Sequence, residues 1–122
     1  MAQVLVVDDS NTVRSEVSEF LKANGLGVAT AVDGKDGLAK LKADPAIRLV
    51  VTDVNMPNMD GLTMAEKIRG ELGNTTINII MLTTENTPSM KERGKAAGIK
   101  GWIVKPFNGS AVIATFKKLA GA

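Results

Sequence analysis

The chain has 122 residues, of which 44% are hydrophobic and 23% are charged, as is usual for one soluble globular domain. It contains neither cysteine nor histidine, which excludes disulfides, thiol nucleophiles, cysteine-ligated metals and every catalytic arrangement that needs a histidine of its own. No apolar run approaches the roughly 18 residues of a membrane span. The first ten residues are too short and too acidic for a signal peptide, so we expect a cytoplasmic protein.

Charge is unevenly distributed along the chain. The net charge is +2, but residues 86–122 hold seven Lys and Arg residues against one Glu, which gives +6 there and leaves −4 for residues 1–85. The basic part is either a solvated surface or a docking surface for an acidic partner. It has no recognisable recognition motif for nucleic acid, so we expect no binding of nucleic acid.

Short apolar segments alternate with helical patterns along the whole chain. The first segment is a short, continuous apolar run, which is typical of a strand covered on both faces, whereas the second is less hydrophobic. The strands are predicted at residues 3–7, 27–32, 47–53, 77–82 and 101–105.

A helix is predicted after each of these strands. The first is capped by Ser10 or Asn11 and ends near Gly25, which can adopt the left-handed conformation. It carries an apolar face made of Val13, Val17, Phe20 and Leu21. The second helix begins after Asp33 and passes through Leu38 and Leu41. It ends before Pro45.

The remaining helices follow the same rules. The third has Leu62, Ala65 and Ile68 on one face, and the short fourth helix opens at Pro88, which is favoured in the first turn. The last helix is predicted to begin after a cap at Asn108, and its apolar face consists of Val112, Phe116 and Leu119.

Strict alternation of strands and helices predicts an α/β fold. We expect a flavodoxin-like (βα)5 doubly wound parallel sheet with right-handed crossovers and the strand order 2-1-3-4-5. No linker or repeat interrupts the pattern, so we expect residues 1–122 to form a single domain.

Polar residues stand where the predicted strands end. They are Asp8, Asp9, Asp53, Thr83, Thr84 and Lys105. In a doubly wound sheet these ends meet at one edge, where the winding reverses, so the carboxylates should lie within a few ångströms of one another. They repel unless one is protonated or a cation binds, and carboxylate oxygens favour Mg²⁺.

The segments VLVVDDS, VVTDVNMPNMDG, IIMLTTE and GWIVKPF follow one another in this order. Together they resemble the receiver domain of two-component response regulators over the whole chain, and most closely the single-domain chemotaxis regulators. The resemblance implies a stand-alone receiver without an output domain, which accepts a phosphoryl group and has no separate substrate turnover.

The resemblance also implies roles for individual residues. Asp53 would be the phosphoacceptor, Lys105 would contact the phosphoryl group, and Thr83 would hydrogen-bond it once attached. Magnesium would be held by Asp8, Asp9, Asp53 and the backbone carbonyl of Asn55. The physics suits phosphoryl transfer, in which positioning and charge neutralisation supply most of the rate.

Other positions would control the lifetime of the phosphorylated state and the switch. Asn55 and Glu85 would influence attack by water, and Pro106 would follow a cis peptide bond that aims Lys105 into the site. Trp102 stands where the chemotaxis regulators have a tyrosine, and Thr84 where a smaller residue is common. Movement of Thr83 toward the phosphoryl group would let Trp102 shift from an exposed to an inward position.

The partners implied are a chemotaxis-type histidine kinase as phosphodonor, a flagellar motor switch protein or other effector, and a phosphatase, with the chain itself a monomer. The effector would dock on the fourth helix, fifth strand and fifth helix. The residues expected on that face are Lys91, Lys95, Trp102 and Lys117, with Lys118 as a further candidate.

Two alternatives belong to other functional classes. The protein could be a phosphate sink or phosphorelay intermediate, which needs no effector. An aspartate-nucleophile phosphatase is disfavoured, because its signature has a second aspartate where this chain has Asn55 and because 122 residues leave no room for a substrate cap.

Overall fold

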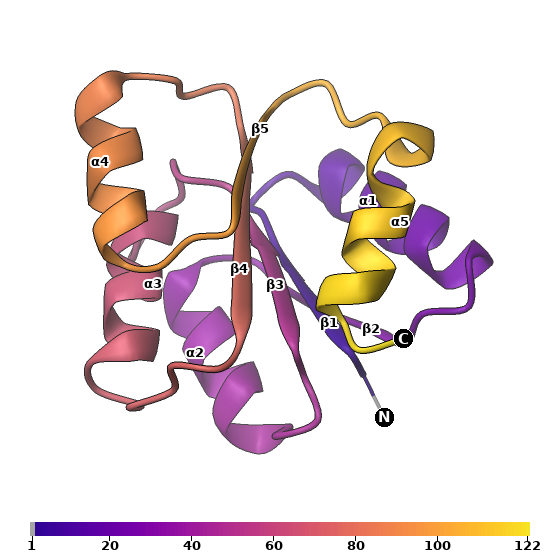
Figure 1. Cartoon of the computed structure of the whole chain (residues 1–122), viewed down its shortest axis with the longest axis horizontal. Coiled ribbons are helices and arrows are strands. Elements are labelled where there is room, and N and C mark those ends of the chain that lie inside the picture. Colours follow the sequence, from indigo (N-terminus) through magenta and orange to yellow (C-terminus); the bar gives the residue numbers. More distant parts are fainter. Residues whose placement is uncertain (1) are drawn as a thin grey trace.

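The computed structural model describes residues 2–122, which form a five-stranded parallel sheet and five helices. The strands are β1 (Val4–Val7), β2 (Val28–Ala31), β3 (Leu49–Thr52), β4 (Asn78–Thr83) and β5 (Gly101–Val104). The helices are α1 (Asn11–Ala23), α2 (Gly34–Ala43), α3 (Gly61–Arg69), α4 (Pro88–Ala96) and α5 (Gly109–Leu119). The sheet order is β2-β1-β3-β4-β5, which confirms the predicted fold (Figure 1).

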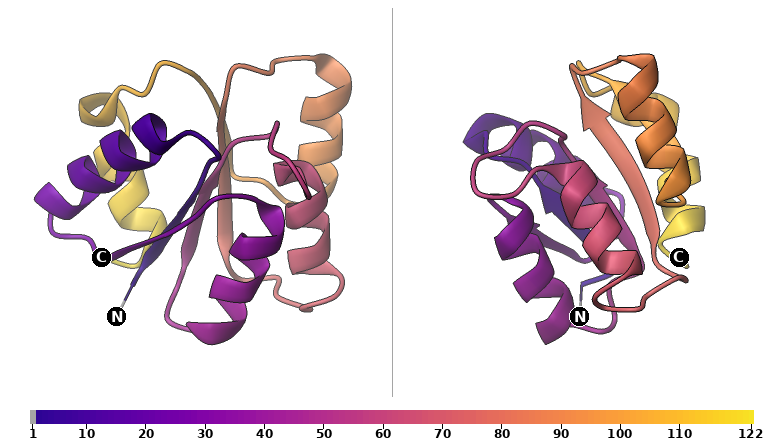
Figure 2. Two further views of the ribbon diagram at one scale, coloured as in Figure 1. Left: turned by 180° about the vertical axis from the view of Figure 1, so that it is seen from behind. Right: turned by 90° about the vertical axis from the view of Figure 1, so that its left-hand side faces the viewer.

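Helices cover both faces of the sheet (Figures 1 and 2). Side chains of β1 alternate between the two cores: Leu5 packs on the side of α2, α3 and α4, whereas Val4 and Val6 pack on the side of α1 and α5. Burial on both faces explains why β1 and most of β3 and β4 are apolar. The edge strands β2 and β5 are only half-buried over most of their length.

Element boundaries differ from the predicted ones by one or two residues. Four strands are shorter than predicted, and β4 is shifted one residue toward the carboxyl end, so that it includes Thr83. The cap of α1 is Ser10, whose hydroxyl accepts the N–H of Val13 at 3.3 Å, and Gly25 has a positive φ of 86°. Among residues 2–122, no helix combines the length and the apolar character that crossing a membrane requires.

The predicted cap of the last helix is wrong in one respect. Asn108 occupies the N-cap position of α5, but its side chain makes no capping hydrogen bond. Its amide oxygen instead accepts the hydroxyl of Ser110 at 3.0 Å. Serine hydroxyls compete with backbone N–H groups for nearby acceptors, which the capping rule alone does not take into account.

The loop after β3 is fastened to the start of α2. The carboxylate of Asp33 accepts the backbone N–H of Asp36 and the side-chain amide of Asn58, both at 2.8 Å. Gly34 donates its N–H to the carbonyl of Met59 at 3.0 Å, and a Cβ at Gly34 would come within 2.7 Å of Met59. The hydrogen bonds from Asp36 and Asn58 hold the pKa of Asp33 below its usual value.

We expect Asp33 to make stability depend on pH at the acidic end. Because the pKa of Asp33 is lower in the folded chain than in the unfolded one, its contribution is fully present above the unfolded value of 3.8 and is lost as pH falls through the folded value. Asp33→Ala should lower the free energy of unfolding at neutral pH by about 1 kcal/mol, the usual cost of losing a cap. Urea denaturation at pH 7 and at steps below pH 4 measures both effects.

Asp33→Asn is the matched control, since asparagine caps helices about as well as aspartate but carries no charge. This variant should keep most of the stability at pH 7 and lose the dependence below pH 4. An equal slope in the parent and in Asp33→Asn would assign the acid sensitivity to other carboxylates.

Candidate functional site

The hydrogen-bond ladder of the sheet continues one residue beyond three of its strands. The backbone N–H groups of Asp8, Asp53 and Lys105 donate to carbonyls of neighbouring strands at 3.1, 3.0 and 2.9 Å. All three residues therefore have fixed backbones at the carboxyl edge of the sheet. This is the edge at which doubly wound sheets bind their ligands.

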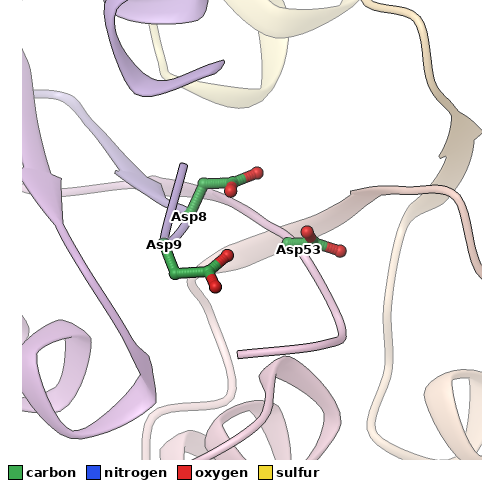
Figure 3. A group of neighbouring side chains, drawn as sticks. All are labelled: Asp8, Asp9 and Asp53. Atoms are coloured by element: carbon green, nitrogen blue, oxygen red, sulfur yellow. The ribbon is translucent and has the colours of Figure 1, made fainter. Parts of the chain in front are cut away.

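The carboxylates of Asp8, Asp9 and Asp53 form a cluster at this edge (Figure 3). One oxygen from each lies within 4.8 Å of the others, which confirms the predicted crowding. Asp8 and Asp53 are buried, with exposed fractions of 2% and 9%, whereas Asp9 is exposed. The cluster is thus anchored in the protein at two carboxylates and open to solvent at the third.

Lys105 neutralises part of this cluster. Its ammonium nitrogen lies 3.0 Å from an Oδ2 atom of both Asp8 and Asp53. Burial lowers the pKa of Lys105, but the hydrogen bonds and charges of the two carboxylates together outweigh burial and raise it. For Asp8 burial is the largest influence and raises the pKa of its carboxyl despite the opposing hydrogen bonds from Ser10 and Lys105. The Lys105–Pro106 peptide bond is cis, as expected.

The backbone around Asp53 is tightly folded. The N–H of Val54 donates to Oδ1 of Asp53 at 2.7 Å, and the hydroxyl of Thr52 donates to the Asp53 carbonyl at 2.9 Å. The chain then returns so closely that a Cβ at Gly61 would lie 2.0 Å from that carbonyl oxygen. Only glycine fits there, which explains the DG pair that closes the motif.

Two loops meet beside the cluster. The side-chain amide of Asn55 donates to the carboxylate of Glu85, joining the loop after β3 to the loop after β4. The N–H of Glu85 donates to the hydroxyl of Thr83 at 3.2 Å, and Thr83 is fully buried. The carbonyl of Glu85 accepts the indole N–H of Trp102 at 2.8 Å. Glu85 therefore contacts the predicted hydrolysis-controlling, phosphoryl-binding and switch residues at once.

Trp102 is half-buried rather than exposed, which corrects the starting position expected for the switch. Its ring packs beside Gly94 of α4, where a Cβ would approach the ring to 3.2 Å. A glycine in the facing helix thus makes room for the indole. The indole N–H adds an attachment to the loop after β4.

Basic residues surround this indole. A shallow pocket of about 190 Å³ is lined by Lys91, Gly94, Lys95, Ile99, Lys100, Gly101 and Trp102. Lys117 lies on α5, across β5 from α4 (Figure 1). Lys118 lines a separate pocket with Arg48 and Pro45, so it is not grouped with the other lysines.

The sequence did not point to several contacts near the site. Arg14 of α1 donates to the carbonyl of Asp8 at 2.5 Å and also contacts Asn11. In the helical pattern Arg14 looks like any other surface arginine, so the sequence did not predict these contacts. Lys100 joins the basic pocket from the turn before β5. Thr84 is exposed and lines a pocket of about 370 Å³ with Lys105, Pro106, Phe107, Val13 and Glu16.

Comparisons with known proteins agree with this geometry. The family model of the response regulator receiver domain matches residues 4–117. The chain is 38% identical over 113 residues to chemotaxis protein CheY of Treponema pallidum, covering 91% of this chain and 77% of that protein. CheY4 of Vibrio cholerae has a solved structure with a TM-score of 0.88, 41% identity and 98% coverage of both chains.

A second solved structure contains chemical groups relevant to the cluster. It is the CheX–CheY–BeF3–Mg²⁺ complex of Borrelia burgdorferi, in which one chain matches with a TM-score of 0.86 and 28% identity, covering 94% of this chain and 86% of that one. The chain described here belongs to the response regulator receiver family, and within that family it is similar to the CheY chemotaxis proteins.

Proposed function

We propose that this chain is a stand-alone response regulator that accepts a phosphoryl group from a histidine kinase on Asp53. The observation that carries the proposal is the position of Asp53, a carboxylate at a strand end, 3.0 Å from the Lys105 ammonium and clustered with Asp8 and Asp9. A carboxylate in this position can act as the nucleophile, while the neighbouring ammonium supplies cationic charge for the incoming phosphoryl group.

The transfer exchanges one bond to phosphorus for another. A carboxylate oxygen of Asp53 attacks the phosphorus of the donor phosphohistidine, the P–N bond breaks, and an acyl phosphate forms. The imidazole of the kinase leaves with the electron pair of that bond and takes up a proton. Lys105 stabilises charge on the transferring oxygens, and the Thr83 hydroxyl is proposed to hydrogen-bond the phosphoryl group afterwards.

The carboxylate cluster fits a magnesium ion. Its donors are hard oxygens, and Mg²⁺ usually takes one or two carboxylates directly and retains waters. Asp8, Asp9 and Asp53 would hold the ion together with the carbonyl of Asn55. When bound, it would supply positive charge that neutralises the phosphoryl oxygens.

The direct test is incubation with acetyl phosphate and Mg²⁺ followed by intact-mass measurement. The parent chain should gain the mass of one phosphoryl group. EDTA should prevent the gain, because the proposal requires the metal. A chain that gains no mass with acetyl phosphate or with a purified histidine kinase is not a phosphorylated receiver.

Replacing Glu85 should affect the lifetime of the phosphorylated state. Its carboxylate bonds to Asn55 beside the acceptor, where a water must enter to hydrolyse the acyl phosphate. Glu85→Ala should change the dephosphorylation rate by several-fold or more and the phosphorylation rate by less. Radiolabel decay and single-turnover labelling measure the two rates. Equal changes in both would instead indicate a general loss of site geometry.

The output surface is proposed to be formed by α4, β5 and α5. The pocket beside Trp102 is bordered by Lys91, Lys95 and Lys100, which suit an acidic, amphipathic segment of an effector. A flagellar motor switch protein is the effector that we propose, and a protein that removes the phosphoryl group is a further proposed partner. An aromatic residue within a basic pocket favours this reading over a phosphate sink, which needs no docking surface.

A further inference from the structure

An arginine of α4 forms an ion pair with a glutamate of α3. Nε and Nη2 of Arg93 each lie 2.8 Å from one carboxylate oxygen of Glu66, and Nη2 also lies 3.0 Å from the hydroxyl of Thr63. Two parallel hydrogen bonds between guanidinium and carboxylate fix orientation as well as distance. These contacts therefore connect α4 directly to α3.

The same contacts continue to the loop that follows Asp53. The hydroxyl of Thr63 donates to the carboxylate of Asp60 at 2.9 Å while it accepts from Arg93, which uses its single proton and one lone pair. Asp60 caps α3 and ends the loop that begins at Val54. A continuous set of polar contacts thus joins the loop beside the phosphoacceptor to α4.

Apolar packing holds α4 only weakly. Its sequence, PSMKERGKA, is mostly polar, and of its residues Pro88–Ala96 only Gly94 is buried. Helices with few buried apolar contacts open and move at low cost in free energy. Polar contacts therefore contribute to the attachment of α4: Arg93 contacts Glu66, and Nε of Arg69 donates to the carbonyl of Ala97, directly after the helix, at 2.9 Å.

The amino end of α4 is connected to the site as well. The loop before this helix contains Glu85, which contacts Asn55, Thr83 and Trp102. A movement of Thr83 or Asn55 on phosphorylation would therefore be transmitted through Glu85 to the amino end of α4. The contact between Arg93 and Glu66, more than one turn further along the helix, opposes such a displacement of α4.

We propose that Arg93 and Glu66 form a clamp that holds α4 in its unphosphorylated position and thereby sets how readily the chain responds to phosphorylation. This inference rests on the proposed receiver function. The clamp stabilises the arrangement in which it is made, and any arrangement with α4 displaced from α3 loses it. Breaking the clamp shifts the population toward the displaced arrangement, and a ligand that favours that arrangement then binds more tightly.

The test is titration with beryllofluoride, an acyl-phosphate mimic, in the presence of Mg²⁺, with the bound fraction followed by fluorine NMR. Arg93→Gln and Glu66→Gln should each reach half-saturation at a mimic concentration about twofold to fivefold lower than the parent, the range that an exposed ion pair can supply. The charge-swapped variant Glu66→Arg/Arg93→Glu should return toward the parent value. Thermal melts confirm that each variant is folded.

Lys67→Gln is the matched control. Lys67 and Glu71 form an ion pair of 2.7 Å that is similarly exposed and lies at the end of α3 without reaching α4. This variant should bind the mimic like the parent. If Arg93→Gln and Glu66→Gln also bind like the parent, or if the charge swap restores nothing, the clamp is wrong and the receiver function stands. If the parent itself binds no mimic, the receiver function and the clamp fall together.

Discussion

Asp53→Asn should accept no phosphoryl group from acetyl phosphate under conditions in which the parent is fully labelled. An amide oxygen is a poor nucleophile, so the variant cannot form the acyl phosphate. The substitution preserves shape, and the asparagine oxygen can still accept the N–H of Val54, which contacts Oδ1 of Asp53 at 2.7 Å. The fold should therefore survive, and intact mass with Mg²⁺ present measures the loss.

Asp36→Asn serves as the control for this prediction. Asp36 lies in α2 and its carboxylate accepts the N–H of Val32 at 3.0 Å, so the substitution removes one carboxylate away from the cluster. Asp36→Asn should gain the same mass as the parent. If labelling persisted in Asp53→Asn, another carboxylate would be the phosphoacceptor. Peptide mapping would then distinguish Asp8 from Asp9.

The sequence was sufficient to predict the position of the cluster because two strong regularities act together. Continuous apolar runs mark strands that are buried on both faces, and parallel strands joined by helices bring their carboxyl ends to one edge. Asp8, Asp53 and Lys105 each directly follow one of the observed strands. A boundary error of one residue did not matter, because the backbone ladder continues through these positions.

Side-chain contacts between distant surface residues could not be predicted in the same way. Arg93 and Glu66 are 27 residues apart, and Asn55 and Glu85 are 30 apart. No sequence pattern identifies either pair, because many different polar residues are compatible with exposed positions in helices and loops. These pairs depend on how α3 and α4 are placed by the core, so they become visible only when the tertiary structure is known.

Trp102 illustrates the same limit for burial. A tryptophan on an edge strand is consistent with either an exposed or a covered ring. The outcome depended on Gly94, eight residues earlier on the facing helix, because a larger residue there would crowd the indole. The sequence gives no direct sign that these two residues face each other.

Asp8→Asn should weaken Mg²⁺ binding by more than about tenfold, since even the loss of a residue that only supports a metal ligand costs this much. The same change should leave the metal-free fold as stable as the parent or more stable at neutral pH. Burial raises the pKa of Asp8 even though Lys105 and Ser10 bind its charged form. Its ionisation therefore opposes folding. Calorimetric titration measures metal binding, and denaturation in EDTA measures stability.

The free energy of unfolding of the metal-free parent should depend on pH through Asp8. A carboxyl whose pKa is higher in the folded chain than the value of 3.8 in the unfolded one binds more protons when folded, so stability falls as pH rises through the interval between the two values. Asp8→Asn removes that fall. The amide oxygen can still accept the N–H of Ser10, which contacts Asp8 at 2.9 Å, and Lys105 keeps its partner at Asp53.

Asp9→Asn separates the two effects, because Asp9 belongs to the same cluster but is exposed. It should weaken Mg²⁺ binding while changing the metal-free stability little, since an exposed carboxylate remains hydrated and its charge opposes folding less. A markedly less stable metal-free Asp8→Asn would mean that the contact between Lys105 and Asp8 outweighs the burial of this charge. In that case the ammonium alone balances the cluster, and magnesium is needed for phosphoryl transfer but not to relieve repulsion among the carboxylates.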